Sequence, residues 1–169
     1  MAAEKIMLLV RHAKSSHDIP YLEDKLRTLA DRGKADAQLI GARLRSLQLV
    51  PNLVYSSTAV RTKATITILN QHLIIPEGSI TYHDDLYTFH DTGDTYVNYL
   101  HKTSNDKSSV MILSHNGSCL NVAYQITDGE ISSFPTCAVL ICRWQVQEWS
   151  EVRLDNVSSY QMITPKELR

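Results

Sequence analysis

The chain has few cysteines and no excess of charge of either sign. Its 169 residues include three cysteines, an odd number, and the spacing of Cys119, Cys137 and Cys142 does not match a metal-binding pair. We therefore expect small buried thiols in a reducing compartment rather than disulfides. The formal net charge is −1, from 17 basic and 18 acidic residues. This balance argues against nucleic acid and against an anionic membrane surface as partners.

The sequence also lacks any segment that would place it in a membrane. No apolar stretch approaches the roughly 20 residues that span a bilayer. Near the N-terminus the apolar run at residues 6–10 follows Lys5 and is too short for the core of a signal peptide. We expect a cytoplasmic monomer in which residues 1–169 form one domain, with a polar tail from about residue 155.

Strands and helices are predicted to alternate along the chain. Short apolar runs predict strands at residues 6–10, 53–55, 80–82 and 109–113. Helices are predicted at about 32–46, 59–73, 95–102 and 118–126, with Asp31 as the N-cap of the first. Residues 136–144 and 148–154 are predicted as two late strands at an antiparallel edge. The order indicates an α/β fold, a three-layer sandwich around a mostly parallel sheet.

Two of the predicted buried strands end in a histidine. Arg11 and His12 directly follow residues 6–10, and His115 follows residues 109–113. Open α/β sheets bind ligands at the carboxyl ends of their strands, so neighbouring strands would bring both imidazoles to one edge. Arg61 lies near the start of the helix that follows residues 53–55, where unpaired N–H groups favour an anion. We therefore expect these four side chains to converge.

This combination of residues favours phosphoryl transfer. The planar guanidinium group of an arginine fits phosphate oxygens, and a neutral histidine is a nucleophile near physiological pH. His12 would attack phosphorus to form a phosphohistidine, which water then hydrolyses. The side chains supply the positive charge, so we expect no metal ion and no cofactor. We also expect activity to fall in mild acid, when His12 takes up a proton.

Five ordered segments support a resemblance to a known family. They are residues 8–16 (LLVRHAKSS), 27–33 (RTLADRG), 54–62 (VYSSTAVRT), 86–87 (LY) and 112–116 (ILSHN). The chain resembles the histidine phosphatase superfamily, also called phosphoglycerate-mutase-like, and within it the short phosphohistidine phosphatases of the SixA type. The resemblance implies a phosphoglycerate-mutase-like fold and makes His12 the residue that is phosphorylated.

The resemblance also assigns the phosphate pocket. It implies that Arg11, Arg61 and His115 form this pocket, with His115 donating a hydrogen bond to a phosphate oxygen. Asn116 is close enough in sequence to line it. Many family members have an acidic residue in mid-chain that protonates the leaving group, and here Asp84 and Asp85 are both candidates. Short SixA-type members often have Glu after the Leu-Tyr pair, where this chain has Thr88.

The length of the chain bears on the substrate. It leaves no room for the large insertions that cap the site in the mutases of the superfamily, so the crevice should be shallow and open. We predict a metal-independent phosphatase whose substrate is phosphohistidine on a protein, such as a phosphorelay domain. Two alternatives remain: a phosphatase for small phosphate esters within the same superfamily, and a non-catalytic module that binds phosphoproteins.

Overall fold

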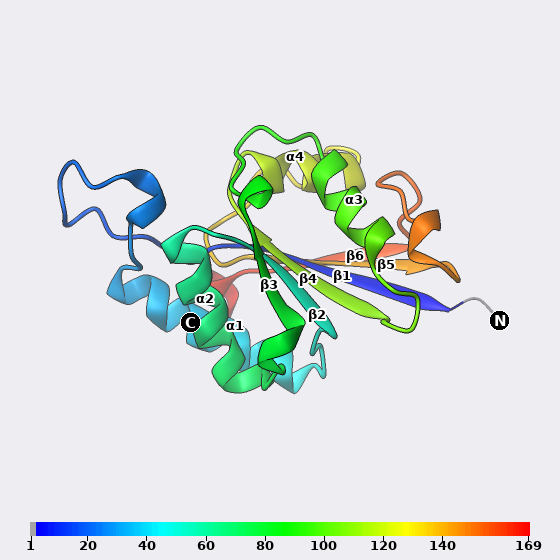
Figure 1. Cartoon of the computed structure of the whole chain (residues 1–169), viewed down its shortest axis with the longest axis horizontal. Helices are drawn as coiled ribbons and strands as arrows, with labels where there is room; N and C mark the ends of the chain where they lie inside the picture. The colour runs from blue at the N-terminus through cyan, green and yellow to red at the C-terminus, as the bar shows by residue number, and fades with distance from the viewer. Residues whose placement is uncertain (1–2) are drawn as a thin grey trace.

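Helices cover both faces of a mixed sheet. The computed structural model describes residues 3–169, in which six strands are ordered β3-β2-β4-β1-β5-β6. The strands are β1 (Glu4–Arg11), β2 (Leu53–Ser57), β3 (Ile80–His83), β4 (Ser109–Ser114), β5 (Val139–Gln145) and β6 (Ser159–Ile163). The α-helices are α1 (Asp31–Ser46), α2 (Val60–Leu73), α3 (Asp94–Lys102) and α4 (Ser118–Ile126). Helices α1 and α2 lie on one face and α3 and α4 on the other, which confirms the predicted sandwich (Figure 1).

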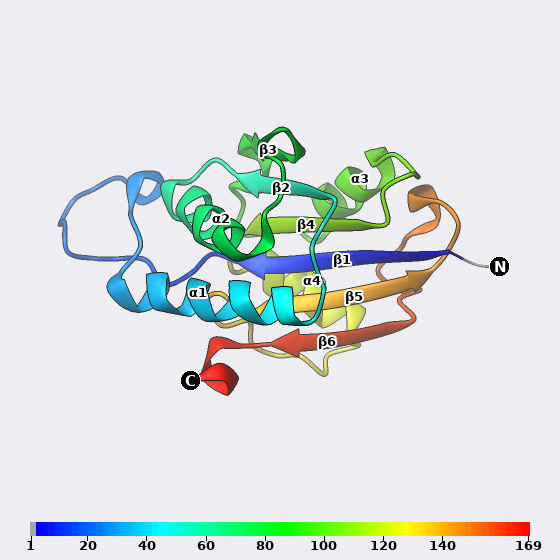
Figure 2. The ribbon, with the colours of Figure 1, turned by 90° about the horizontal axis from the view of Figure 1, so that it is seen from below.

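The strand directions bring five carboxyl ends, those of β1, β2, β3, β4 and β6, to one end of the sheet. Strands β1, β4, β2 and β3 pair in parallel, whereas β5 runs antiparallel to β1, and β6 antiparallel to β5. Figure 2 shows the resulting order, with β6 at the edge. The register of β1 against β4 pairs Arg11 with Ser114, so the residues that follow the two strands are direct neighbours.

The central strand β1 is buried on both faces. Its side chains alternate, as strand geometry requires. Met7 and Leu9 pack in the cluster that includes residues of α3 and α4, and Leu8 and Val10 pack in the cluster that includes residues of α1 and α2. The three cysteines are free and buried, as expected. Within residues 3–169, no helix is both long enough and apolar enough to cross a bilayer.

Two predictions for the C-terminal region were wrong. Residues 148–154 were predicted as a strand, but Trp149–Glu151 form a short 3-10 helix that Glu148 and Glu151 close with a capping box. Trp149 and Val152 are buried, so the apolar pattern reflected packing rather than extended backbone. The segment predicted as a polar tail contains the edge strand β6 instead. Its exposed and partly buried residues alternate, so its few apolar residues do not form a continuous run in the sequence.

The start of α1 differs from the prediction. Ala30, not Asp31, is the N-cap, and no side chain caps the helix there. Asp36 of α1 is buried and forms a 2.8 Å ion pair with Arg169, the last residue of the chain. Gly33 lies so close to the strand–loop junction that a Cβ atom on it would be 2.2 Å from the carbonyl oxygen of Lys14. The start of α1 is therefore packed tightly against the backbone that follows His12.

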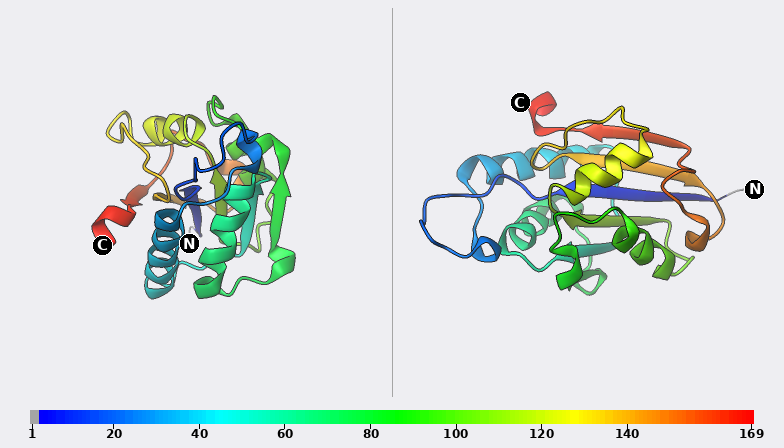
Figure 3. Two further views of the ribbon diagram at one scale, coloured as in Figure 1. Left: turned by 90° about the vertical axis from the view of Figure 1, so that its left-hand side faces the viewer. Right: turned by 90° about the horizontal axis from the view of Figure 1, so that it is seen from above.

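A long loop joins β1 to α1 and projects beyond the carboxyl end of β1 (Figure 3). Its two stems pair through an isolated bridge between Ser15 and Leu29. Its tip exposes Ile19 and Tyr21, and its returning stem contains a short 3-10 helix, η1 (Asp24–Leu26). The loop therefore borders the same end of the sheet as the two histidines.

Candidate active site

The two histidines meet at the ends of β1 and β4. The backbone N–H of His12 donates to the carbonyl oxygen of Ser114 at 3.1 Å, which continues the pairing of the strands by one residue. The ring centroids of His12 and His115 are 5.2 Å apart. The predicted position of both imidazoles at one edge of the sheet is confirmed.

The hydrogen bonds of His12 fix its tautomer. Its Nδ1–H donates to the carbonyl oxygen of Ala13 at 2.7 Å, since that oxygen can only accept. Nε2 accepts a hydrogen bond from Nε–H of Arg61 at 3.2 Å. The ring is thus neutral, and its lone pair lies on Nε2, the atom that would attack phosphorus.

Burial is the main reason that His12 stays neutral. It lowers the pKa of His12 to about 3, and the positive charges of Arg61 and Arg11 act in the same direction, although the hydrogen bond to Ala13 opposes them. The expected loss of activity in mild acid stays a prediction, and this lowered pKa argues against His12 as its cause in the ligand-free protein. His12 remains unprotonated well below pH 6.

Arg61 connects the groups of the site. It lies in the first turn of α2, is only 2% exposed, and donates to Nε2 of His12. Its Nη2 also donates to Nδ1 of His115 at 3.3 Å and to a carboxylate oxygen of Asp24 at 2.9 Å. Its Nη1 donates to the backbone oxygen of Asp24 at 2.6 Å. A single guanidinium group therefore contacts both imidazoles and an acid from the projecting loop.

His115 lies behind Arg61 and is fully buried. Its Nδ1 accepts from Arg61, so its proton lies on Nε2, which donates to Oγ of Ser57 at 2.8 Å. Burial, followed by the proximity of His12 and Arg61, lowers the pKa of His115 to about 2. In this arrangement Nδ1 has no proton to give to a phosphate oxygen. A direct bond of that kind would require the proton to move to Nδ1 and Arg61 to shift.

A cavity of about 270 Å³ opens beside these groups. Its lining residues are Arg11, His12, Lys14, Ser15, His17, Asp24, Arg27, Arg61, Phe89, Asn116 and Thr136. Within residues 3–169, two buried side-chain polar atoms lack a hydrogen-bond partner, Nε of Arg11 and Oδ1 of Asn116. Both belong to residues that line the cavity. A larger hollow of about 610 Å³ lies between α3, α4 and residues 152–155, and none of the predicted site residues line it.

The two candidate acids lie outside the cavity. Asp84 is exposed and binds Lys25 at 2.9 Å and the hydroxyl of Thr58 at 2.6 Å. Asp85 accepts a hydrogen bond from the hydroxyl of Tyr99. Neither carboxylate lines the cavity that contains His12.

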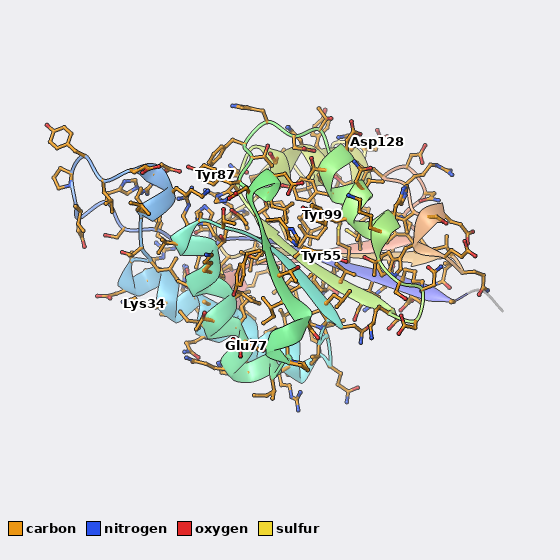
Figure 4. All side chains as sticks on the ribbon, viewed as in Figure 1. Lys34, Tyr55, Glu77, Tyr87, Tyr99 and Asp128 are labelled. Atoms are coloured by element: carbon orange, nitrogen blue, oxygen red, sulfur yellow. The ribbon has the colours of Figure 1, made fainter. Side chains whose placement is uncertain are left out.

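Sequence reasoning missed Asp24. Its carboxylate accepts hydrogen bonds from Arg61, from Arg27 at 3.1 Å and from the hydroxyl of Tyr87 at 2.5 Å. Tyr87 lies at the end of the sheet from which the loop projects (Figure 4). The one available signal was the spacing of Asp24 three residues before Arg27, next to a segment that matched the family. Within the described residues, no three His, Cys, Asp or Glu side chains gather in a way that could hold a metal ion.

Comparison with known proteins agrees with this arrangement. The sequence pattern of the histidine phosphatase superfamily (branch 1) matches residues 7–90, a range that includes Arg11, His12 and Arg61. The chain belongs to the histidine phosphatase superfamily. Its enzyme class is accordingly that of the phosphatases, which are hydrolases.

The names of two proteins of similar sequence state no function. A chloroplast protein of Arabidopsis thaliana is 28% identical over 151 residues, which cover 86% of this chain and 69% of that protein. A protein of Mycobacterium leprae is 29% identical over 161 residues, which cover 86% of this chain and 96% of that protein. Sequence similarity to these relatives therefore extends over most of the chain.

Solved structures share the fold. The SixA protein of Agrobacterium tumefaciens has a TM-score of 0.75 at 24% identity, covering 93% of this chain and 97% of that one. The tungstate complex of the protein histidine phosphatase SixA has a TM-score of 0.78 at 20% identity, with 97% and 99% covered. A phosphoglycerate mutase of Plasmodium falciparum has a TM-score of 0.63 at 15% identity, with 95% and 89% covered. The phosphoglycerate-mutase-like architecture is thereby confirmed.

Proposed function

We propose that this protein hydrolyses phosphohistidine on a protein, through a covalent phosphohistidine on His12 and without a metal ion. In the first step Nε2 of His12 attacks phosphorus, and the bond from phosphorus to the leaving group breaks. In the second step water attacks the phosphorus of the phosphohistidine and releases inorganic phosphate. Arg11 and Arg61 bind the phosphoryl oxygens, Asn116 lines the pocket, and His115 supports Arg61 from behind.

The state of the His12 ring is the observation on which the mechanism depends. A nucleophilic nitrogen must be unprotonated and must face the space that the substrate enters. Nδ1 of His12 holds the proton against Ala13, which leaves the lone pair on Nε2 beside the guanidinium group of Arg61. Attack by Nε2 therefore requires no prior loss of a proton, only that the hydrogen bond from Arg61 breaks.

Two further features support an oxyanion as ligand. Buried polar atoms normally have hydrogen-bond partners, and a buried donor without one in a cavity is a candidate for binding a ligand acceptor. Nε of Arg11 is such a donor, and with Arg61 and Arg27 it supplies positive charge to the cavity. A protein of the same fold, SixA, has been solved with bound tungstate, a tetrahedral oxyanion like phosphate.

The surroundings of the cavity favour a protein substrate over a small ester. Both stems of the projecting loop line the cavity, through Ser15 and His17 on one side and Asp24 and Arg27 on the other. The loop tip lies outside the cavity, and Tyr21 on it is fully exposed. A ligand that only fills 270 Å³ leaves this tip uncovered, whereas a phosphorylated protein surface would reach it.

Trapping the intermediate tests the mechanism. The protein is mixed with a ³²P-labelled phosphohistidine protein and quenched within milliseconds in acid or in base. We expect a label that is stable in base and labile in acid, that maps to His12, and that is absent from His12→Ala. A label on another residue, or one with the acid stability of a phosphoserine, would exclude His12 as the nucleophile.

Comparing substrates tests the assignment of a phosphoprotein. The kcat/KM for a phosphohistidine protein is measured beside those for sugar phosphates and a chromogenic aryl phosphate. A preference for sugar phosphates would favour the small-ester phosphatase instead. Binding of phosphate with neither turnover nor labelling would favour the non-catalytic module.

A further inference from the structure

One carboxylate lies within the proposed phosphate site. Among residues 3–169, Asp24 is the only acidic residue that lines the cavity. It belongs to the short helix η1 of the projecting loop, and its side chain is 46% exposed, so it faces both the site and solvent. Any phosphoryl group bound by Arg61 would lie beside it.

The contacts of Asp24 come from three separate parts of the chain. Arg61 of α2 donates to one carboxylate oxygen, Oδ2, at 2.9 Å, and the hydroxyl of Tyr87 donates to the same oxygen at 2.5 Å. Arg27 donates to the other oxygen, Oδ1, at 3.1 Å. These donors hold the carboxylate at the mouth of the cavity, on the guanidinium group that also contacts His12.

We propose that Asp24 is the acid that protonates the leaving group, an inference that rests on the proposed function. A general acid must come within hydrogen-bond reach of the departing atom. Asp24 lines the same cavity as His12, and Arg61 contacts both side chains, so the carboxylate lies beside any phosphoryl group bound there. Asp84 and Asp85 cannot do so from where they lie, since both point to partners outside the cavity.

Binding of substrate favours the protonated form of Asp24 that this role requires, and the proton comes from solvent. Burial raises the pKa of Asp24, but hydrogen bonds from Tyr87 and Arg61 outweigh it and lower the pKa to about 2, so the free protein holds a carboxylate. A phosphoryl dianion on Arg61 adds negative charge beside Asp24 and takes up part of the positive charge that held it. Both effects raise the pKa of Asp24 and favour its protonation in the complex.

The proton balance closes over the two steps. As Nε2 of His12 bonds to phosphorus, the bond from phosphorus to the leaving oxygen or nitrogen breaks, and that atom takes the proton of Asp24. The resulting carboxylate then accepts a proton from the water that attacks the phosphohistidine. The bond from nitrogen to phosphorus breaks, its electron pair returns to Nε2, and inorganic phosphate leaves. His12 is thereby restored, and Asp24 returns its proton to solvent as phosphate leaves.

The role is tested by comparing two substrates that differ only in their leaving group. The variant is Asp24→Asn, which keeps the shape of the side chain. Phenol has a pKa near 10, like the tyrosine side chain, and needs a proton as it departs. Dinitrophenolate departs without one. We expect the variant to lose about 100-fold in kcat/KM on phenyl phosphate, the scale of general acid catalysis, and less than threefold on 2,4-dinitrophenyl phosphate.

Two control variants make the test specific. Asp18→Asn removes the same charge from the exposed tip of the same loop and should leave both rates unchanged. Asp84→Asn tests the rival acid, and a loss confined to phenyl phosphate in this variant would overturn the proposal. Equal losses on both esters in Asp24→Asn would show that Asp24 only positions Arg61, and no loss on either would remove it from the mechanism.

The inference can fail separately from the proposed function. Labelling of His12 by a phosphohistidine protein does not depend on which residue is the acid. Suppose that His12 of the wild type is labelled and that Asp24→Asn loses the same factor in kcat/KM on both esters. His12 would then stand as the nucleophile, and Asp24 would be rejected as the acid. Absence of any label on His12 would reject both.

Discussion

Replacing Arg61 with alanine should disable the site while leaving the fold intact. The guanidinium group is 2% exposed and donates to Nε2 of His12, to Nδ1 of His115 and to two oxygens of Asp24. Arg61→Ala removes all these donors and the positive charge closest to the attacking atom.

The magnitude follows from what these donors do in the transition state. Loss of one preorganised donor at a developing charge costs about 3 kcal/mol, and each 1.36 kcal/mol is a factor of ten in rate. We therefore expect kcat/KM to fall about 150-fold. The loss should not be smaller, because the carboxylate of Asp24 would remain in the cavity without Arg61 and repel the phosphoryl group.

The assay is release of dinitrophenolate from 2,4-dinitrophenyl phosphate, followed by absorbance under single-turnover and steady-state conditions. Arg61→Lys is the informative companion, since one ammonium keeps the charge but cannot span four acceptor atoms as a planar guanidinium does. It should lose at least tenfold. Arg43→Ala removes an exposed arginine of α1 and should change nothing. A loss below tenfold in a folded Arg61→Ala protein would refute the assignment of Arg61 to the phosphate pocket.

Four further predictions concern the same region. His12→Ala should retain less than about a thousandth of wild-type kcat, since no other group in the site takes the phosphoryl group. A higher residual kcat, measured with the same ester, would point to another nucleophile. EDTA should leave kcat/KM unchanged, and restoration by a divalent cation after dialysis would contradict a metal-independent mechanism. His12 and His115 have pKa values of about 3 and about 2 in the folded protein, against about 6.5 unfolded, so the unfolded chain binds more protons below pH 6.5. Stability in urea should therefore be complete above pH 6.5 and fall steadily toward pH 4, with a shallower fall in His12→Gln; equal slopes would contradict this. Gly117→Ala should unfold at a lower temperature, because φ is +83° at this position and a Cβ atom would be 1.8 Å from the carbonyl oxygen of Phe89; an unchanged Tm would show that the backbone can adjust.

The sequence predicted best the features that depend on buried strands. The apolar runs before His12 and His115 could only be interior strands, and parallel pairing then brings the two rings together. Strand β6 was missed because an edge strand needs apolar residues on one face only, and its residues read as polar. Residues 148–154 were wrongly predicted as a strand because they contain buried apolar residues. Trp149 lies in a 3-10 helix and Val152 directly follows it, so their burial does not come from a strand.

The local sequence pattern could not identify Asp24 as the proposed acid. Asp84 and Asp85 had the expected place in the chain, but their partners Lys25 and Tyr99 turn them away from the cavity. Asp24 enters the site only because a loop of irregular backbone folds back over the end of the sheet. Nothing in the residues around it fixes that path, which depends on tertiary contacts with Arg61 and Tyr87.

The ion pair between Arg169 and Asp36 has a consequence for variants at the last residue. The last side chain of the sequence neutralises a buried acid in α1, and without it only Arg32 stays near, at 3.8 Å. Removal of the Arg169 side chain would therefore leave Asp36 with a single, longer ion pair in the helix that packs on α2.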